Sequence, residues 1–152
     1  MFSNLRSLIF KLDPETAHSL AIKSLKFNFA GNILDDDKNN PLFKTKLFKQ
    51  ELENPIGIAA GFDKNAEVYN SLFKLGFGFV EVGTVTPLKQ YGNPKPRVFR
   101  LVEDKALINR LGFNNFGAKN VLERIKSKKK LGLLGINIGP NKDSKDRNND
   151  YV

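Results

Sequence analysis

Three short apolar segments, separated from one another by helical patterns, place the tightest limit on the fold of this chain. They occupy residues 56–60, 79–83 and 133–138, and the helical patterns lie at 68–75 and 116–130. Strands that are apolar at nearly every residue are typical of parallel sheets covered on both faces, with helices as the crossover connections. The pattern therefore predicts an α/β fold built on a parallel sheet.

Each predicted strand leads into glycine and a hydrogen-bonding residue. Gly61 and Lys64 follow the first strand, Gly83 and Thr84 lie at the end of the second, and Asn137 lies near the end of the third. Singly, such residues are also what a solvated turn contains. The carboxyl ends of parallel strands meet at one edge, so together these residues predict a site for a flat, heteroatom-rich ligand with an anionic group.

The segment 107–117, LINRLGFNNFG, overlaps the end of an insertion at 85–113 that separates the second strand from the second helix. Its three asparagines, one arginine and two glycines argue against a core strand. Asn114 is predicted to cap the helix that follows, which is the structural role of such a residue. Asparagine presents donors and acceptors at every pH, so the same loop also suits recognition of an imide or amide ring.

The first thirty residues predict two short helices. Asp13 before Pro14 is a typical start for the second helix, whose apolar stripe is formed by Ala17, Leu20, Ala21 and Leu25. Such a pair either packs on the main domain or lies at a membrane surface near a ligand entrance. Residues 31–43 are predicted to be a linker, and 46–54 a hairpin around Lys49 and Gln50.

The composition narrows the chemistry. The 152 residues include no cysteine and a single histidine, His18, which excludes thiolate metal sites, disulfides and cysteine nucleophiles. The net charge is +9, but 19 of the 25 basic residues are lysines scattered along the chain, whereas nucleic-acid recognition favours the arginine fork. The densest group, Lys126 with 128–130, lies at a helix end, where cations complement the dipole. We therefore predict no metal site and no nucleic-acid partner.

Five motifs in matching order and spacing resemble the dihydroorotate dehydrogenases. They are AAGFDKN at 59–65, EVGTVTP at 81–87, GNPKPRVFRL at 92–101, LINRLGFNNFG at 107–117 and LGINIGPNKD at 134–143. LDPETAH at 12–18 resembles the N-terminal extension of the class 2, quinone-using members. The resemblance implies the N-terminal part of an FMN-binding (β/α)8 TIM barrel over 44–152, preceded by a two-helix extension over 1–30 on the quinone and membrane side.

The resemblance also implies an activity and its residues. The family oxidises dihydroorotate to orotate in pyrimidine biosynthesis, and class 2 members pass the electrons through FMN to a membrane quinone. Positions matching the family's FMN contacts are Ala60, Gly61, Phe62, Asp63, Lys64, Thr84 and Asn137. Those matching its substrate-binding residues are Lys64, Asn109, Arg110, Leu111, Gly112 and Phe113. The implied location is peripheral, on the cytoplasmic side of the inner membrane.

No residue here matches the family's catalytic serine base, and three strands do not close an eight-stranded barrel. We therefore expect this chain to be an N-terminal fragment that is inactive alone and retains FMN poorly. Three other functions remain open from the sequence. They are another FMN-dependent TIM-barrel oxidoreductase of the class 1 type, a non-catalytic fragment acting as an interaction module, and a basic nucleic-acid binder, which the scattered lysines disfavour.

Overall fold

The computed structural model describes residues 9–27 and 41–152. The helices in order are α2 (Pro14–Lys26), η1 (Pro41–Phe43), α3 (Tyr69–Lys74), α4 (Ala118–Lys126) and η2 (Asn149–Tyr151). The strands are β1 (Thr45–Leu47), β2 (Gln50–Leu52), β3 (Gly57–Ile58), β4 (Phe79–Val85), β5 (Val98–Leu101), β6 (Ala106–Asn109) and β7 (Leu133–Ile138). The predicted first helix and most of the predicted linker lie outside the described residues.

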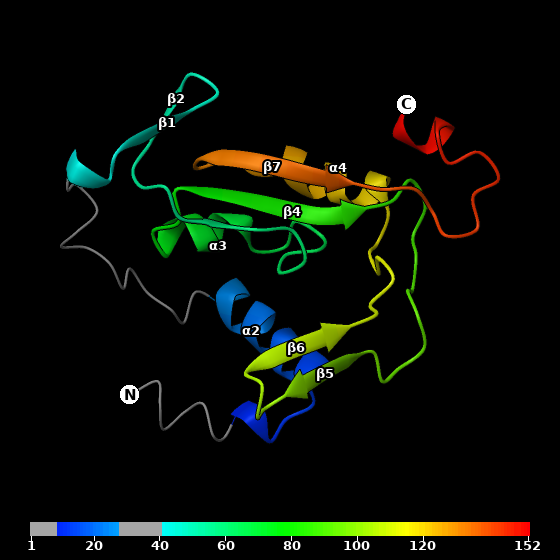
Figure 1. Ribbon diagram of the computed structural model, residues 1–152. Helices are drawn as coiled ribbons and strands as arrows, with labels where there is room; N and C mark the ends of the chain where they lie inside the picture. The colour runs from blue at the N-terminus through cyan, green and yellow to red at the C-terminus, as the bar shows by residue number, and fades with distance from the viewer. Residues whose placement is uncertain (1–8, 28–40) are drawn as a thin grey trace.

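A parallel sheet in the order β3-β4-β7 forms the centre of the chain (Figure 1). The register aligns Ile58 with Val80, and Val82 with Ile136. The predicted α/β fold is thus confirmed, and the third strand has the predicted bounds. The first strand is shorter than predicted, because only Gly57 and Ile58 pair with β4 before the chain turns away. The second is longer, because pairing with β7 resumes at Val85 after an irregularity.

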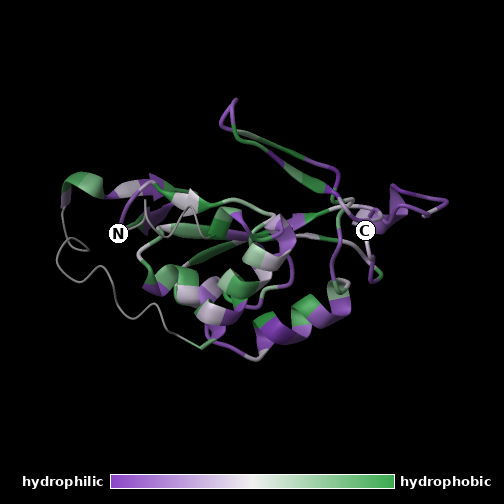
Figure 2. Cartoon of the chain, turned by 90° about the horizontal axis from the view of Figure 1, so that it is seen from below, coloured by the Kyte–Doolittle hydropathy of each residue, from purple (hydrophilic) through white to green (hydrophobic). Residues whose placement is uncertain are grey.

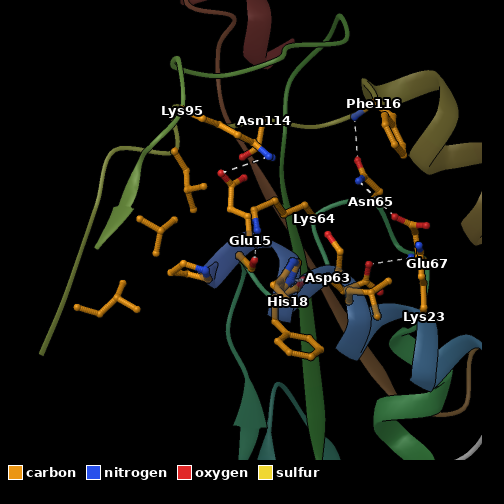
Figure 3. A pocket seen from close by; sticks show the side chains of 18 of the residues that line it. Glu15, His18, Lys23, Asp63, Lys64, Asn65, Glu67, Lys95, Asn114 and Phe116 are labelled. Atoms are coloured by element: carbon orange, nitrogen blue, oxygen red, sulfur yellow. Dashed lines mark hydrogen bonds and ion pairs between the residues drawn. The ribbon is translucent and has the colours of Figure 1, made fainter. Parts of the chain in front are cut away.

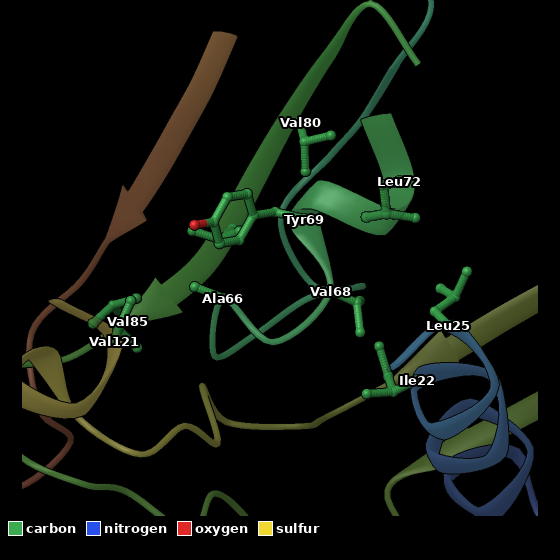
Figure 4. Close-up of a cluster of buried hydrophobic side chains, with 10 residues drawn as sticks. Ile22, Leu25, Ala66, Val68, Tyr69, Leu72, Val80, Val85 and Val121 are labelled. Carbon is green, nitrogen blue, oxygen red and sulfur yellow. The ribbon is translucent and has the colours of Figure 1, made fainter. Parts of the chain in front are cut away.

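Two helices pack against this sheet and bury its middle strand. Val80 and Val82 of β4 are fully buried, in contact with a cluster that includes Tyr69 and Leu72 of α3 and Val121 of α4 (Figure 4). Gly76 follows α3 with a φ of 98°, the left-handed conformation that glycine adopts readily after a helix, as the sequence predicted. The core therefore lies between the sheet and these helices, and it includes Ala66 and Val68 of the loop that follows β3.

The start of α4 differs from the prediction. Gly117, not Asn114, is the N-cap residue, and glycine has no side chain that could make a capping hydrogen bond. The neighbouring Asn115 is the structural amide: its Oδ1 accepts hydrogen bonds from the backbone N–H of Gly117 at 2.8 Å and of Thr86 at 3.2 Å. Asn115 is 3% exposed. Its two hydrogen bonds connect the start of α4 to the end of β4.

Helix α2 begins as predicted but buries a different face. The backbone N–H of Thr16 donates to Oδ1 of Asp13 at 2.9 Å, which is the expected N-cap. Ile22 and Leu25 are buried against the core, whereas Leu20 of the predicted apolar stripe is 50% exposed. The face turned toward the domain therefore differs from the apolar stripe, and it also carries polar residues, which are described below.

Two antiparallel hairpins flank the central sheet. The predicted hairpin is confirmed as β1 and β2, with Phe48 and Lys49 at positive φ in the turn, one residue earlier than expected. The insertion contains the β5–β6 hairpin, whose strands carry apolar residues and whose tip at 102–105 is hydrophilic at its centre (Figure 2). This hairpin lies beside α2 on one side of the sheet (Figure 1).

Candidate functional site

The loop that follows β3 is joined to the end of β4 by backbone hydrogen bonds. The N–H of Gly61 donates to the carbonyl of Gly83 at 2.8 Å, and the N–H of Gly83 donates to the carbonyl of Asp63 at 3.1 Å. These bonds hold residues 61–63 alongside the carboxyl end of β4, although the two strands pair over only two residues. The predicted meeting of the first two strand ends is therefore confirmed.

The two glycines of this junction have different surroundings. Gly61 has a φ of 110°, and a Cβ built on it would meet no other atom within 4 Å. Gly83 has a φ of 111°, and a Cβ there would lie 2.4 Å from the carbonyl oxygen of Asn137. Gly83 thus allows β4 and β7 to approach each other, whereas Gly61 presents bare backbone to open space, which a flat ligand requires for close contact.

The third strand end joins the same edge through side chains. The hydroxyl of Thr84 donates to Oδ1 of Asn137 at 2.6 Å, and Nδ2 of Asn137 donates to Oε1 of Glu81 at 3.1 Å. These three side chains form a hydrogen-bonded row across β4 and β7. Ala60, Phe62 and Thr84 are each partly exposed. The structure thus brings the predicted residues of all three strand ends to one edge of the sheet.

The side chain of Asp63 serves the fold of this loop. It is 1% exposed, and its Oδ1 and Oδ2 accept hydrogen bonds from the backbone N–H groups of Glu67 at 2.8 Å and Val68 at 2.7 Å. Both carboxylate oxygens are therefore committed to the turn that leads into α3. Any contact of Asp63 with a ligand at this edge falls to its backbone, while its side chain fixes the shape of the loop.

Lys64 extends from the same loop and is half-buried. Its Nζ donates to the carbonyl of Gly61 at 2.5 Å. Burial lowers the pKa of Lys64, and the nearby Arg97 guanidinium acts in the same direction, while the carboxylates of Glu15 and Asp63 oppose the change. Among residues 9–27 and 41–152, this neutral carbonyl is the one hydrogen-bond acceptor of the Lys64 ammonium. A half-buried cation with so little compensation is suited to pair with an anionic ligand.

A pocket of about 530 Å³ lies between α2, the loop after β3 and the β5–β6 hairpin (Figure 3). Its apolar wall includes Ile22, Phe62, Val98, Leu107, Leu111 and Phe116, and its polar lining includes Glu15, His18, Lys64, Arg100 and Asn114. Within the described part of the chain, Oδ1 of Asn114 is a buried acceptor with no hydrogen-bond partner. Mixed walls of this kind suit a small organic ring that carries a few polar groups.

The predicted substrate loop, residues 109–113, is held by its backbone. The N–H of Arg110 donates to the carbonyl of Arg97 at 2.8 Å, and Nδ2 of Asn93 donates to the carbonyl of Arg110 at 2.7 Å. Gly112 has a φ of 72°, which turns the chain. Only Leu111 of this loop lines the pocket, while the side chains of Asn109, Arg110 and Phe113 are exposed. Residues 107–109 of the wider segment 107–117 belong to β6, an exposed strand.

Three residues at this site were missed as functional candidates. Glu15 and His18 belong to LDPETAH, and Arg97 to GNPKPRVFRL. Nε2 of His18 donates to the carbonyl of Phe62 at 2.7 Å, since a carbonyl only accepts, and the two rings meet edge to face at 5.4 Å. Arg97 is 7% exposed and pairs with Glu15. Glu15 and His18 lie three residues apart and therefore share one face of α2, and this polar stripe was the sequence signal that could have identified them.

Proteins of one family are similar to this chain along nearly its whole length. A family model described as dihydroorotate dehydrogenase matches residues 42–152. A dihydroorotate dehydrogenase (quinone) of Bartonella henselae is 55% identical over 147 residues, covering 97% of this chain and 40% of the relative. One of Agrobacterium fabrum is 50% identical, covering 100% of this chain and 42% of the relative. The chain thus spans about 40% of the length of these curated relatives.

Solved structures give the same result. The crystal structure of DHODH from Eimeria tenella in complex with ferulenol has a TM-score of 0.80 and 41% sequence identity, covering 91% of this chain and 39% of that one. The ligand-free DHODH from the same organism has a TM-score of 0.78 at the same identity. At this identity, the likeness extends beyond the arrangement of helices and strands to the sequence at many positions.

Proposed function

This chain belongs to the dihydroorotate dehydrogenase family, and from that membership we propose that it is the first part of a quinone-dependent enzyme that oxidises dihydroorotate to orotate in pyrimidine biosynthesis. Its three parallel strands would be the first of a (β/α)8 barrel, and the residues that the relatives carry outside the matched region would supply the others. The observation that carries the proposal is the convergence of Gly61, Lys64, Thr84 and Asn137 at one sheet edge, next to a pocket closed by α2.

FMN is the proposed cofactor, and the residues present fit it. The bare backbone at Gly61 faces open space, and the hydroxyl of Thr84 and the amide of Asn137 lie at the same edge. These groups would hold the rim of a flavin ring and satisfy its carbonyls and ring nitrogens. The chemistry that FMN supplies when bound is hydride acceptance and onward transfer of electrons. Ala60, Phe62 and Asp63 would contribute their backbone to the same rim.

The substrate would be held by the charge of Lys64 and by the loop 109–113. The half-buried ammonium of Lys64 would pair with the carboxylate of dihydroorotate, and this loop would supply amide and backbone groups for the pyrimidine ring. Rigid placement is the contribution of this chain to catalysis, because the loop is fixed to residues 93 and 97 by backbone hydrogen bonds. No residue of the chain is proposed as the base.

The pocket beside α2 is the proposed site for the quinone. Its apolar walls suit the ring and the beginning of an isoprenoid tail, and the cationic group of Arg100 suits a carbonyl oxygen. Phe62 lies in both the flavin loop and the pocket wall, so a quinone there would be separated from the flavin by little more than this loop. The names of the relatives, which specify quinone, favour this acceptor over the class 1 alternatives.

Membrane association of residues 1–30 is proposed from the outer face of the described part of this segment. Leu20 is 50% exposed and Phe27 73%. Among the described residues, none of the helices has the length and apolar character needed to cross a bilayer. A face of this kind would lie in the lipid interface and bring quinone to the pocket. We propose a peripheral location on the cytoplasmic side of the inner membrane.

The test uses a completed enzyme, made by joining residues 1–152 to the part of the Bartonella henselae relative that lies beyond the matched region. We expect it to bind FMN and to reduce a short-chain quinone with dihydroorotate as the donor. Lys64→Ala should weaken orotate binding and slow flavin reduction by dihydroorotate, while flavin reoxidation by quinone is less affected. An unchanged reductive half-reaction in that variant would remove Lys64 from the substrate site.

A further inference from the structure

Arg97 is a buried guanidinium whose hydrogen bonds connect two distant parts of the chain. It is 7% exposed. Its Nε donates to both carboxylate oxygens of Glu15 at 3.1 Å, and its Nη2 donates to Oε1 at 2.7 Å. Its Nη1 donates to three backbone carbonyls, those of Tyr91 at 2.7 Å, Asn93 at 3.0 Å and Leu111 at 3.5 Å. One planar side chain thus links α2 to two loops.

The partner carboxylate, that of Glu15, is also largely shielded from solvent. The side chain of Glu15 is 18% exposed and comes from the first turn of α2, where a negative charge is favoured by the helix dipole. The hydrogen bonds from Arg97 hold the pKa of Glu15 below its ordinary value, and the charge of Lys95, with Nζ 3.8 Å from Oε2, contributes in the same direction. The pair is therefore ionised at neutral pH and joined by a fork of charge-assisted bonds.

The two ends of this pair lie at different proposed binding sites. Glu15 lines the pocket beside α2, together with His18 and Lys64 (Figure 3). The carbonyl of Leu111 belongs to the substrate loop 109–113, and Asn93 bonds the same loop through the carbonyl of Arg110. Arg97 also accepts the N–H of Arg110 on its own carbonyl. A shift of α2 therefore reaches the loop through a short chain of bonded groups.

We propose that Arg97 is a positioning residue that couples the substrate loop to helix α2 through Glu15, so that occupancy of the pocket and substrate affinity depend on each other. The proposal rests on the proposed function of the two sites. By thermodynamic linkage, a ligand that fixes α2 tightens substrate binding by the same factor by which substrate tightens the binding of that ligand. Neither Arg97 nor Glu15 needs to touch the reacting atoms for this effect.

The test measures the kinetics of the completed enzyme with a soluble dye as acceptor and, separately, with a short-chain quinone. Arg97→Lys keeps a positive charge but loses the fork, and we expect it to raise the KM for dihydroorotate about tenfold while kcat with the dye changes less than threefold. Glu15→Gln should raise this KM about fivefold. The double variant should be no worse than Arg97→Lys alone, because the two residues act as one unit.

The controls are Arg147→Lys and Glu103→Gln, which make the same chemical changes at exposed positions away from both sites. A second measurement is the orotate affinity with and without saturating quinone, which should differ in the parent and become equal in Arg97→Lys. A role in stability alone would lower the melting temperature and leave KM and this difference unchanged, and that result would overturn the proposal. Failure of the parent itself to oxidise dihydroorotate would instead overturn the proposed function.

Discussion

The commitment of Asp63 to two backbone amides makes Asp63→Asn an informative perturbation. In the parent, Oδ1 and Oδ2 accept the N–H groups of Glu67 and Val68 at 2.8 and 2.7 Å, within a site that is 1% exposed. Asparagine has the same shape but only one acceptor oxygen, so its NH2 group faces one of the two amide donors. That donor loses its partner, and the remaining bond is no longer charge-assisted.

The expected magnitude follows from these two losses. A buried donor left without an acceptor costs about 1–3 kcal/mol, and replacing a charge-assisted bond with a neutral one costs about 1 kcal/mol. The local opening free energy of the loop should therefore fall by about 2–4 kcal/mol. At about 1.4 kcal/mol for each factor of ten, amide hydrogen exchange at Glu67 and Val68 should accelerate by roughly 30- to 700-fold.

The assay is hydrogen exchange of the completed enzyme, followed by titration with FMN. Asp63 also accepts the N–H of Gly83 on its carbonyl, so a loosened loop should weaken FMN binding as well. Asp104→Asn, at the exposed tip of the β5–β6 hairpin, provides the matched control and should leave both quantities unchanged. Unchanged exchange at Glu67 and Val68 in Asp63→Asn would refute the reasoning that this carboxylate holds the loop.

Three further predictions concern charge, packing and backbone. Burial lowers the pKa of Lys64, so orotate affinity should begin to fall at a lower pH than it would for a free lysine. Lys64→Arg should remove this loss of affinity at alkaline pH, as binding titrations would show. Val82→Ala empties a fully buried site and should lower the free energy of unfolding by about 2–3 kcal/mol in denaturant titrations. Gly61→Ala should lower the free energy of unfolding by about 1–2 kcal/mol because of its positive φ alone. In Gly83→Ala the new Cβ would also meet the Asn137 carbonyl, so the melting temperature should fall further than in Gly61→Ala.

Much of the central sheet was predictable because its residues obey local rules. The strand 133–138 is apolar at nearly every residue and has the predicted bounds, and Gly76 and Asp13 occupy the helix ends that their conformations and side chains favour. The end of β4 was not predictable in the same way. Its pairing resumes at Val85 after an irregularity, and this depends on a neighbouring strand some fifty residues later in the sequence.

The parts that were missed depend on tertiary contacts between polar groups. Leu20 belongs to the predicted apolar stripe but is exposed, because the face of α2 that packs on the domain includes Glu15 and His18. Their partners, Arg97 and Phe62, are far away in the sequence. A hydrophobic pattern does not detect such a face. Asn115, and not the predicted Asn114, holds the start of α4. The sequence pattern did not distinguish the two, because Oδ1 of Asn115 also accepts a hydrogen bond from the end of β4, which is a tertiary contact.

We propose that the strand ends of this chain form part of the site of a quinone-dependent dihydroorotate dehydrogenase. The most direct measurement follows orotate formation and quinone reduction together in the FMN-loaded completed enzyme. We expect one quinone to be reduced for each orotate formed, and we expect both rates to fall together in Lys64→Ala. Absence of orotate formation, or electron transfer to fumarate or NAD in preference to quinone, would contradict it.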